Sequence, residues 1–193
     1  MRRAATTAAT RQAVINSARE LLATVPWREF TLEAVAAGAG VTRVTVYNQV
    51  RNKAGLLDAV LTELTVRTGM DQLLTGARDL EPAAALAYVV GQTCRCWHAE
   101  RAVLRPLFGL AAVDAGIATH LAGREERRRE QFRRLLPGLG EADLAAVVAV
   151  TSFPAYDALG VVGDDPEVAA GLISRMVHGL GDATLIEATP RRS

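Results

Sequence analysis

The stretch GVTRVTVYNQVRNK, Gly40 to Lys53, decides the fold of the N-terminal part of this chain. Seven of its first eleven residues are Val, Thr or Tyr, which favour strands by propensity. The apolar residues do not alternate as a half-buried strand requires, however. If Thr42 is an N-cap, Val41 and Val46 form a hydrophobic staple, and Val46 and Val50 lie on one helical face. Capping and periodicity therefore predict a short helix.

The residues on either side extend this pattern. Thr31 is expected to cap a two-turn helix that ends at the glycines of GAG, residues 38–40. Asn52 is expected to cap a further helix, whose first residue is Lys53. A cation is unfavourable at a helix N-terminus unless an external anion such as phosphate lies nearby. Two short capped helices joined by a glycine turn are the outline of a helix-turn-helix.

The outward face of the second short helix suits a DNA major groove. Its residues are Arg43, Val44, Thr45, Tyr47 and Asn48. Arginine can bond guanine in bidentate fashion, and the Val44 and Thr45 methyl groups can contact thymine methyl groups. We expect phosphate contacts on either side of this face, from Thr42, Tyr47, Gln49 and Lys53.

Composition agrees with a helical, anion-binding protein. The 193 residues are half apolar and rich in Ala, Leu, Arg and Glu, which predicts an all-α fold. Residues 1–53 carry a net charge of +5 and residues 54–193 a net charge of −4. A basic front end suits a polyanionic partner. No apolar run approaches 18 residues and no signal-peptide core is evident, so we expect a cytoplasmic protein with no membrane partner.

The segment from Arg11 to Val60 resembles the DNA-binding domain of the TetR family of bacterial transcription regulators. The matching residues are Ala18 in an amphipathic helix, Thr31, Val35-Ala36, Ala39-Gly40-Val41-Thr42, Thr45-Val46-Tyr47, Val50, Lys53 and Leu56-Leu57. Four places depart from the family pattern: Pro26-Trp27 replaces a glycine-aromatic turn, Val44 a small residue, Val50 a Phe and Gly55 a Glu. Of these, Val44 alone lies on the groove face.

The resemblance implies both a fold and site residues. The fold would be all-α, with an N-terminal three-helix helix-turn-helix domain and a C-terminal helical domain for ligand binding and dimerisation. We expect a flexible basic arm over 1–10, a DNA-binding domain over 11–55 and an effector and dimer domain over 56–193. The residues expected to contact bases are Arg43, Val44 and Tyr47. Those expected to contact phosphates are Thr31, Thr42, Thr45, Tyr47, Gln49 and Lys53. The function implied is a homodimeric regulator, a repressor released from a palindromic operator by a small molecule.

The last two long helices, expected at about 142–160 and 166–181, carry more apolar surface than a monomer could bury. Asp165 is expected to cap the second, with Pro166 in its first turn. The dimer-interface candidates are Leu144, Val148, Leu159, Val168, Leu172, Met176 and Leu180. Burial of both helices within one subunit is the alternative.

Six residues of the second half are candidates for an effector pocket. The large aromatic or polar-aromatic residues of the second half are Tyr88, Trp97, His98, Phe108, Phe153 and Tyr156. They suit a hydrophobic or aromatic effector, and core packing is the alternative for each. The sequence CRCWH also suggests an alternative, a redox or metal-responsive regulator that uses Cys94, Cys96 and His98. Cys94 and Cys96 point to opposite sides of a helix, which argues against a disulfide between them.

Other functions receive little support. The run REERRREQFRR pairs Glu with Arg at i, i+4 and is typical of a solvated, ion-paired helix face. None of the three histidines lies in a nucleophile or acid–base motif, so we expect no enzyme, no catalytic residue, no metal and no cofactor. A DNA-binding protein without an effector remains open, although the large apolar second half disfavours an architectural protein.

Overall fold

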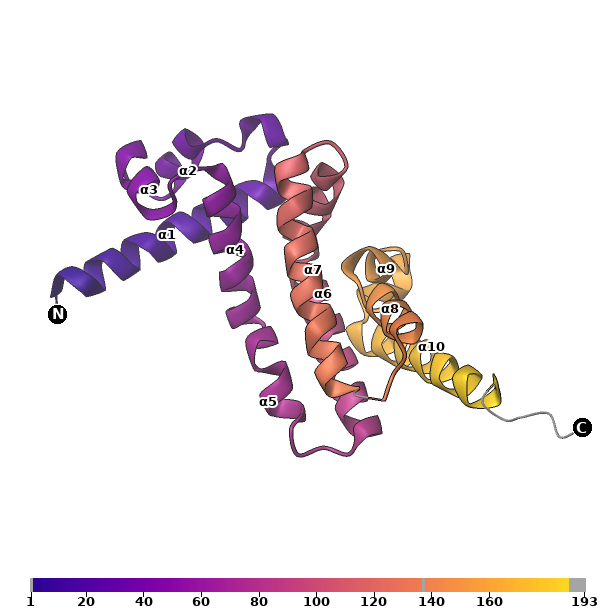
Figure 1. Cartoon of the computed structure of the whole chain (residues 1–193). Coiled ribbons are helices and arrows are strands. Elements are labelled where there is room, and N and C mark those ends of the chain that lie inside the picture. Colours follow the sequence, from indigo (N-terminus) through magenta and orange to yellow (C-terminus); the bar gives the residue numbers. More distant parts are fainter. Residues whose placement is uncertain (1, 137, 188–193) are drawn as a thin grey trace, which may run out of the picture. The chain divides into compact units, whose positions relative to one another are not determined.

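The computed structural model describes residues 2–136 and 138–187, with side chains described for 7–136 and 138–179. All the regular elements within these ranges are helices (Figure 1). The α-helices are α1 (Arg2–Thr24), α2 (Leu32–Gly38), α3 (Arg43–Val50), α4 (Lys53–Arg67), α5 (Leu73–Ala77), α6 (Pro82–Ala111), α7 (Ala115–Leu135), α8 (Glu141–Val150), α9 (Phe153–Asp157) and α10 (Pro166–Glu187). Three short 3₁₀ helices are η1 (Trp27–Glu29), η2 (Met70–Gln72) and η3 (Gly160–Asp164).

The chain forms two compact units. The first comprises residues 1–67 and 102–121, and the second comprises residues 68–101 and 122–193. Helices α6 and α7 therefore each contribute to both units. The predicted boundary near residue 55 does not anticipate this sharing, since the first unit also includes the end of α6 and the start of α7.

In the first unit, α1 packs against α2, α3 and α4. Val14, Ala18 and Val46 are fully buried in the resulting core. Helix α1 also lies close to α2. The Ser17 hydroxyl on α1 donates a hydrogen bond to the Val35 carbonyl on α2, at 3.0 Å. A Cβ at Gly38 would overlap the Ser17 hydroxyl, so a larger residue there would displace this hydroxyl from its bond to Val35.

Both short helices begin at the predicted caps. The Thr31 hydroxyl accepts from the Ala34 amide at 3.1 Å, and the Thr42 hydroxyl accepts from the Thr45 amide at 3.2 Å. Gly40, with φ of +64°, makes the turn between the two helices. The opening stretch is thus helical from Arg43 to Val50 despite its β-branched composition.

The junction between α3 and α4 is unusually tight. Arg51 has φ of +67° and ψ of −52°, and the Asn52 amide donates back to the Val50 carbonyl at 2.7 Å. This is a γ-turn of the strained, positive-φ kind. Asn52 then caps α4 by accepting from the Gly55 amide at 2.8 Å. A Cβ at Gly55 would overlap the Val50 carbonyl oxygen, which explains why glycine stands where the resemblance led us to expect glutamate.

In the second unit, α10 packs along α8 and against η3 (Figure 1). Asp165 caps α10 as predicted, accepting from the amides of Glu167 and Val168. The buried core of this second unit includes Leu144, Phe153 and Tyr156.

Two expectations about helix boundaries were wrong. Residues 2–10 belong to α1 rather than to a flexible arm. The helix expected over 142–160 divides into α8, α9 and η3, because Ser152 caps a new helix by accepting from the Ala155 amide.

Within the described ranges, no single helix is both long and apolar enough to cross a membrane. The bent pair α6 and α7 passes the same criterion of length and composition when taken together.

Candidate nucleic-acid interface and effector region

Helix α3 presents a clear division between a buried and an exposed face. Val46 and Val50 are buried, with 0% and 5% exposure, and fix the helix on the core of its unit. Val44 and Tyr47 are 67% and 54% exposed, a high exposure for large apolar side chains. Arg43 and Asn48 are exposed on the same helix. The face that the sequence predicted to enter a groove is therefore open.

Arg43 forms an ion pair on this face. Its Nε lies 2.6 Å from Glu33 Oε1 on α2, and both side chains are more than half exposed. Exposed ion pairs of this kind contribute little to stability, typically below 1 kcal/mol. The guanidinium is thus held near its position but can leave Glu33 for a stronger partner.

The hydroxyl groups near the start of α3 form a small cluster. Thr42 Oγ1 and Thr45 Oγ1 are 2.9 Å apart, and Thr42 also caps the helix. Thr31 lies at the equivalent position of α2 and is exposed. Both cap residues therefore sit at helix N-termini, where backbone amides favour an anion.

The C-terminal end of α3 is tied to α1 by a contact that sequence reasoning missed. Arg11 Nη1 donates to the Gln49 carbonyl oxygen at 3.0 Å. Arginine is a favourable partner for the free carbonyls at a helix C-terminus. The sequence shows only that Arg11 is a basic residue at the start of the amphipathic pattern, which does not identify a hydrogen-bond partner 38 residues away.

Lys53 lies against aromatic rings in this structure. Its Nζ is 3.4 Å from the centroid of Trp27 and 5.2 Å from that of Phe30, a cation–π arrangement. Burial lowers the pKa of Lys53, and the charge of Asp114 partly opposes this shift. Trp27, one of the departures from the family pattern, therefore supplies the contact where an anion was expected.

Residues 14–60 match the family model for bacterial regulatory proteins of the tetR family. This segment contains α2, α3, both caps and the start of α4. This N-terminal segment of the chain is therefore of the TetR family. No curated protein sequence matches it.

Three solved structures share the fold of this chain. A transcriptional regulator from Rhodococcus sp. Rha1 has a TM-score of 0.71 and 19% identity, covering 90% of this chain and 96% of that one. A proposed fatty acid metabolism regulator from Clostridium perfringens has a TM-score of 0.68 and 16% identity, covering 86% and 96%. The TetR family repressor AlkX from Dietzia sp. strain DQ12-45-1b, implicated in biodegradation of n-alkanes, has a TM-score of 0.50 and 18% identity, covering 89% and 95%. At these identities the likeness shows the fold.

Four of the six pocket candidates gather in the second unit. Trp97 Nε1 donates to the Thr151 carbonyl at 3.0 Å, and its ring meets Phe153 edge-on at 5.9 Å. The Tyr156 hydroxyl donates to the Gly163 carbonyl at 2.6 Å, and His98 Nδ1 lies 3.3 Å from the same oxygen. Their polar atoms are thus occupied by backbone carbonyls, which favours the core-packing alternative.

The other two candidates lie apart from this cluster. Tyr88 is on α6 beside Gly76, where a Cβ would overlap the phenol. Phe108 belongs to the first unit.

A different hollow in the second unit is lined by α5, α6 and α7. Leu73, Val89, Phe132, Thr93, Arg128 and Gln131 contribute to its walls. It holds about 250 Å³ of empty space, its opening to solvent included. None of the six predicted pocket residues lines it, and aliphatic side chains in an alanine- and leucine-rich sequence gave no signal for it.

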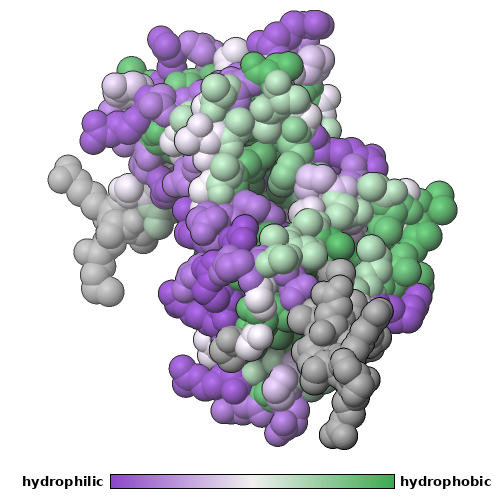
Figure 2. Space-filling view, turned by 45° about the vertical axis from the view of Figure 1, so that its right-hand side comes forward, coloured by the Kyte–Doolittle hydropathy of each residue, from purple (hydrophilic) through white to green (hydrophobic). Residues whose placement is uncertain are grey.

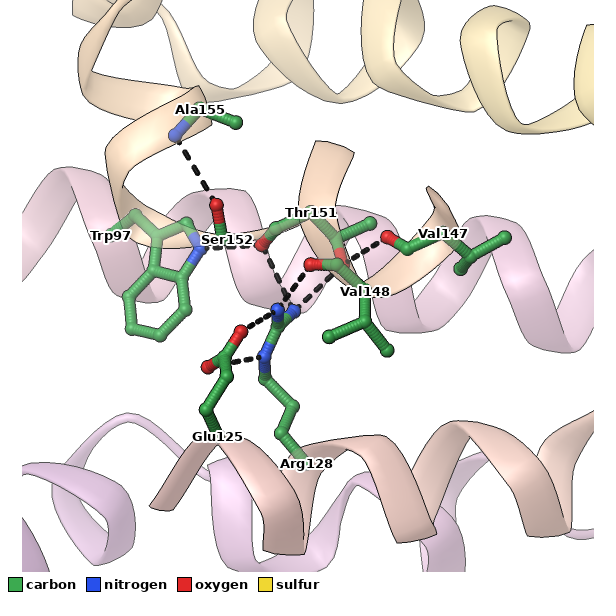
Figure 3. A network of polar contacts seen from close by, with 8 residues as sticks. All are labelled: Trp97, Glu125, Arg128, Val147, Val148, Thr151, Ser152 and Ala155. Atoms are coloured by element: carbon green, nitrogen blue, oxygen red, sulfur yellow. Dashed lines mark hydrogen bonds and ion pairs between the residues drawn. The ribbon is translucent and has the colours of Figure 1, made fainter. Parts of the chain in front are cut away.

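Arg128 is buried, which its position in the charged run did not predict. It is 7% exposed, although REERRREQFRR was expected to be a solvated face. Its guanidinium bonds both oxygens of Glu125, the Thr151 carbonyl and hydroxyl, and the Val148 carbonyl (Figure 3). It therefore satisfies the free carbonyls at the C-terminus of α8. The rest of the run does form ion pairs, including Arg134 with Glu130 and Arg129 with Glu141.

The two cysteines are buried and free. Burial, reinforced by the charge of Glu167, raises the pKa of the Cys94 thiol to about 12. The thiol is therefore protonated at neutral pH, whereas the thiolate is the reactive form and the metal ligand. No group of three or more potential metal-ligating side chains occurs among the described residues.

The dimer candidates divide by exposure. Val168 and Met176 on α10 are exposed, Leu159 and Leu172 are half-buried, and Leu144 and Val148 are buried within the subunit. The side chain of Leu180 lies outside the described residues. Val161 and Val162 of η3, which the sequence analysis did not select, add 84% and 36% exposed side chains. The space-filling view shows hydrophobic surface over the C-terminal elements of this unit (Figure 2).

Proposed function

We propose that this TetR-family transcription regulator is a repressor that binds a palindromic operator as a homodimer, through the exposed face of α3. The observation that carries the proposal is the pairing of a fully buried Val46 with exposed Arg43, Val44 and Tyr47 on the same two turns. Large apolar groups held in water on a rigid helix suggest a surface completed by a partner. With an arginine beside them, the partner that fits is the major groove.

The roles follow from the positions. Arg43 leaves Glu33 to bond a guanine, and Val44 and Tyr47 contact base edges and thymine methyl groups. Thr31, Thr42, Thr45, Asn48 and Gln49 position the helix through the backbone. Lys53 moves from the Trp27 ring toward a phosphate, since a cation–π contact at a partly exposed site costs only about 0.5–1 kcal/mol to give up.

Two copies are needed for a two-fold operator. The exposed Val161, Val168 and Met176 form an apolar surface on η3 and α10 that suits a second copy of the chain. Such a dimer would present two α3 helices to half-sites about one duplex turn apart. A small hydrophobic effector bound in the second unit would shift the pair away from this spacing and release the DNA.

Redox or metal control through Cys94, Cys96 and His98 is the weaker alternative. Both thiols are buried, and the high pKa of Cys94 disfavours the thiolate on which either mechanism depends. We likewise infer a binding protein rather than an enzyme. An effector-free DNA-binding protein is the other alternative.

The DNA-contact roles can be tested with Arg43→Ala and Lys53→Ala, measured by fluorescence anisotropy on a DNA site selected by the wild-type protein. Arg43→Ala should weaken binding by about 1–3 kcal/mol per half-site and relax preference at one base pair of each half. Lys53→Ala should weaken binding to all sequences alike and reduce the salt slope by about 1 per subunit. A uniform loss for Arg43→Ala would remove its base-reading role. An unchanged salt slope for Lys53→Ala would remove its phosphate role.

A further inference from the structure

The turn between α3 and α4 holds an arginine in an unfavourable backbone conformation. Arg51 has φ of +67° and ψ of −52°, and within the described ranges it is the one residue other than glycine with a positive φ. Such a conformation is strained for a residue with a side chain, and it persists where the surrounding structure holds it. Strained residues gather at binding sites, so Arg51 calls for an explanation.

The neighbouring turn between α2 and α3 shows the usual solution. Gly40, with φ of +64°, makes that turn without steric cost. The α3–α4 turn makes a similar demand on φ but carries arginine. This contrast points to a contribution from the Arg51 side chain that the backbone does not explain.

The fold itself does not use this side chain. Arg51 is exposed, and its guanidinium has no hydrogen bond or ion pair with any described residue. A cation near the C-terminus of a helix can bond the free carbonyls there. At the end of α3 this is done by Arg11 of α1, which donates to the Gln49 carbonyl at 3.0 Å. The role that the helix end offers to a cation is therefore filled by another residue.

The charge of Arg51 is also left without an opposite partner. Residues 34–57 contain three cations, Arg43, Arg51 and Lys53, and no Asp or Glu. Glu33 lies 2.6 Å from Arg43, and the charge of Asp114 acts on Lys53. For Arg51 the described part of the chain supplies no such group. An exposed guanidinium of this kind, beside the open face of α3, suits an anion from outside the protein.

We propose that Arg51 binds a DNA phosphate beside the bases that α3 contacts, and that the strained turn persists because this contact needs a guanidinium there. In the chain, Arg51 lies between Tyr47 and Lys53, to which the proposed function gives a base contact and a phosphate contact. A guanidinium matches phosphate oxygens in bidentate geometry, which glycine cannot replace. The inference rests on the proposed DNA-binding function and adds a contact that the sequence analysis did not select.

The test combines thermal unfolding with the salt dependence of DNA binding, both for the full-length protein. Fluorescence anisotropy on a duplex of arbitrary sequence, between about 50 and 200 mM salt, gives the slope. Arg51→Gly removes the strain and the guanidinium together. It should raise the melting temperature by about 2–4 °C, weaken binding at the lower salt about tenfold, and reduce the salt slope by about 1 per subunit.

Two further variants serve as controls. Arg51→Lys keeps both the charge and the strained turn, so its melting temperature and salt slope should stay close to those of the wild type. Arg127→Gly removes the same charge from an exposed position of α7 in the second unit. It should leave the salt slope unchanged and lower the melting temperature, because glycine is a poor helix former.

Two results would overturn the inference: a melting temperature that Arg51→Gly does not raise, or a salt slope that it leaves unchanged. Arg43→Ala, measured on the selected site, separates the inference from the proposed function. If Arg43→Ala relaxes base preference while Arg51→Gly binds like the wild type, base reading by α3 stands and the Arg51 contact fails. If Arg51→Gly reduces the salt slope while Arg43→Ala leaves base preference unchanged, the Arg51 contact stands and the reading role of α3 fails.

Discussion

At the residue scale, the turn between α3 and α4 shows how one small residue, Gly55, fixes the end of helix α3. Arg51 takes a positive φ and Asn52 bonds back to Val50, so the chain reverses within a few residues. Gly55 then passes close to the Val50 carbonyl. The turn therefore depends on glycine at this position, because a Cβ would overlap the Val50 carbonyl oxygen.

We predict that Gly55→Ala lowers the free energy of unfolding by about 1–3 kcal/mol, because the added Cβ must displace backbone rather than a flexible side chain. Urea unfolding followed by circular dichroism measures the change. Since the turn also positions α3, DNA affinity should fall as well.

Gly109→Ala is the matched control, since Gly109 is helical and a Cβ there meets nothing within 4 Å. Its helix should gain roughly 0.5–1 kcal/mol from the better helix former. If Gly55→Ala were as stable as Gly109→Ala, the tight α3–α4 turn would not exist as described.

At the element scale, α7 and α8 are joined by a buried charge. Arg128 reaches from α7 to the last carbonyls of α8, while Glu125 one turn away balances its charge (Figure 3). Buried arginines persist where every donor is used, as here.

Replacing Arg128 with Met should lower the free energy of unfolding by about 3 kcal/mol, because Glu125 loses its partner and buried carbonyls lose their donor. Chemical denaturation of the full-length protein measures this. Arg127→Met, one position along on the exposed side of α7, should change it by less than about 0.5 kcal/mol. Equal effects of the two substitutions would show that Arg128 is solvated, as the charge run alone suggested.

The contrast between these elements shows what sequence could predict. The caps at Thr31, Thr42 and Asp165 depend on neighbours within four residues, so local rules predicted them correctly. Arg11 and Arg128 bond carbonyls 38 and 20 to 23 residues away, and their own neighbours carry no sign of it. Likewise, a proline does not reveal whether its helix continues, as at Pro106, or begins, as at Pro154.

The same limit applies to the candidate site. The α3 face could be predicted because the period of one short helix separates buried from exposed residues. The hollow could not, because its walls come from three helices of ordinary aliphatic composition.

At the scale of the whole molecule, the apolar surface on η3 and α10 determines the proposed assembly. We predict that Val161→Asp and Met176→Asp each weaken self-association at least 100-fold, because a carboxylate would be buried without a partner. Sedimentation equilibrium of the full-length protein measures the dissociation constant.

Val113→Asp is the control, because Val113 is 83% exposed, as much as Val161 at 84%, but belongs to the first unit. It should leave the dissociation constant unchanged. Loss of self-association in all three variants, or in none, would contradict an interface on η3 and α10.

The central claim is that two copies of α3 read one symmetric DNA site. Selection of bound sequences from a random duplex pool by the full-length protein tests it most directly. The account predicts a two-fold symmetric consensus with half-sites about one duplex turn apart, and loss of one conserved base pair per half-site when the selection is repeated with Arg43→Ala. Recovery of no consensus, or of a consensus that Arg43→Ala leaves unchanged, would contradict it.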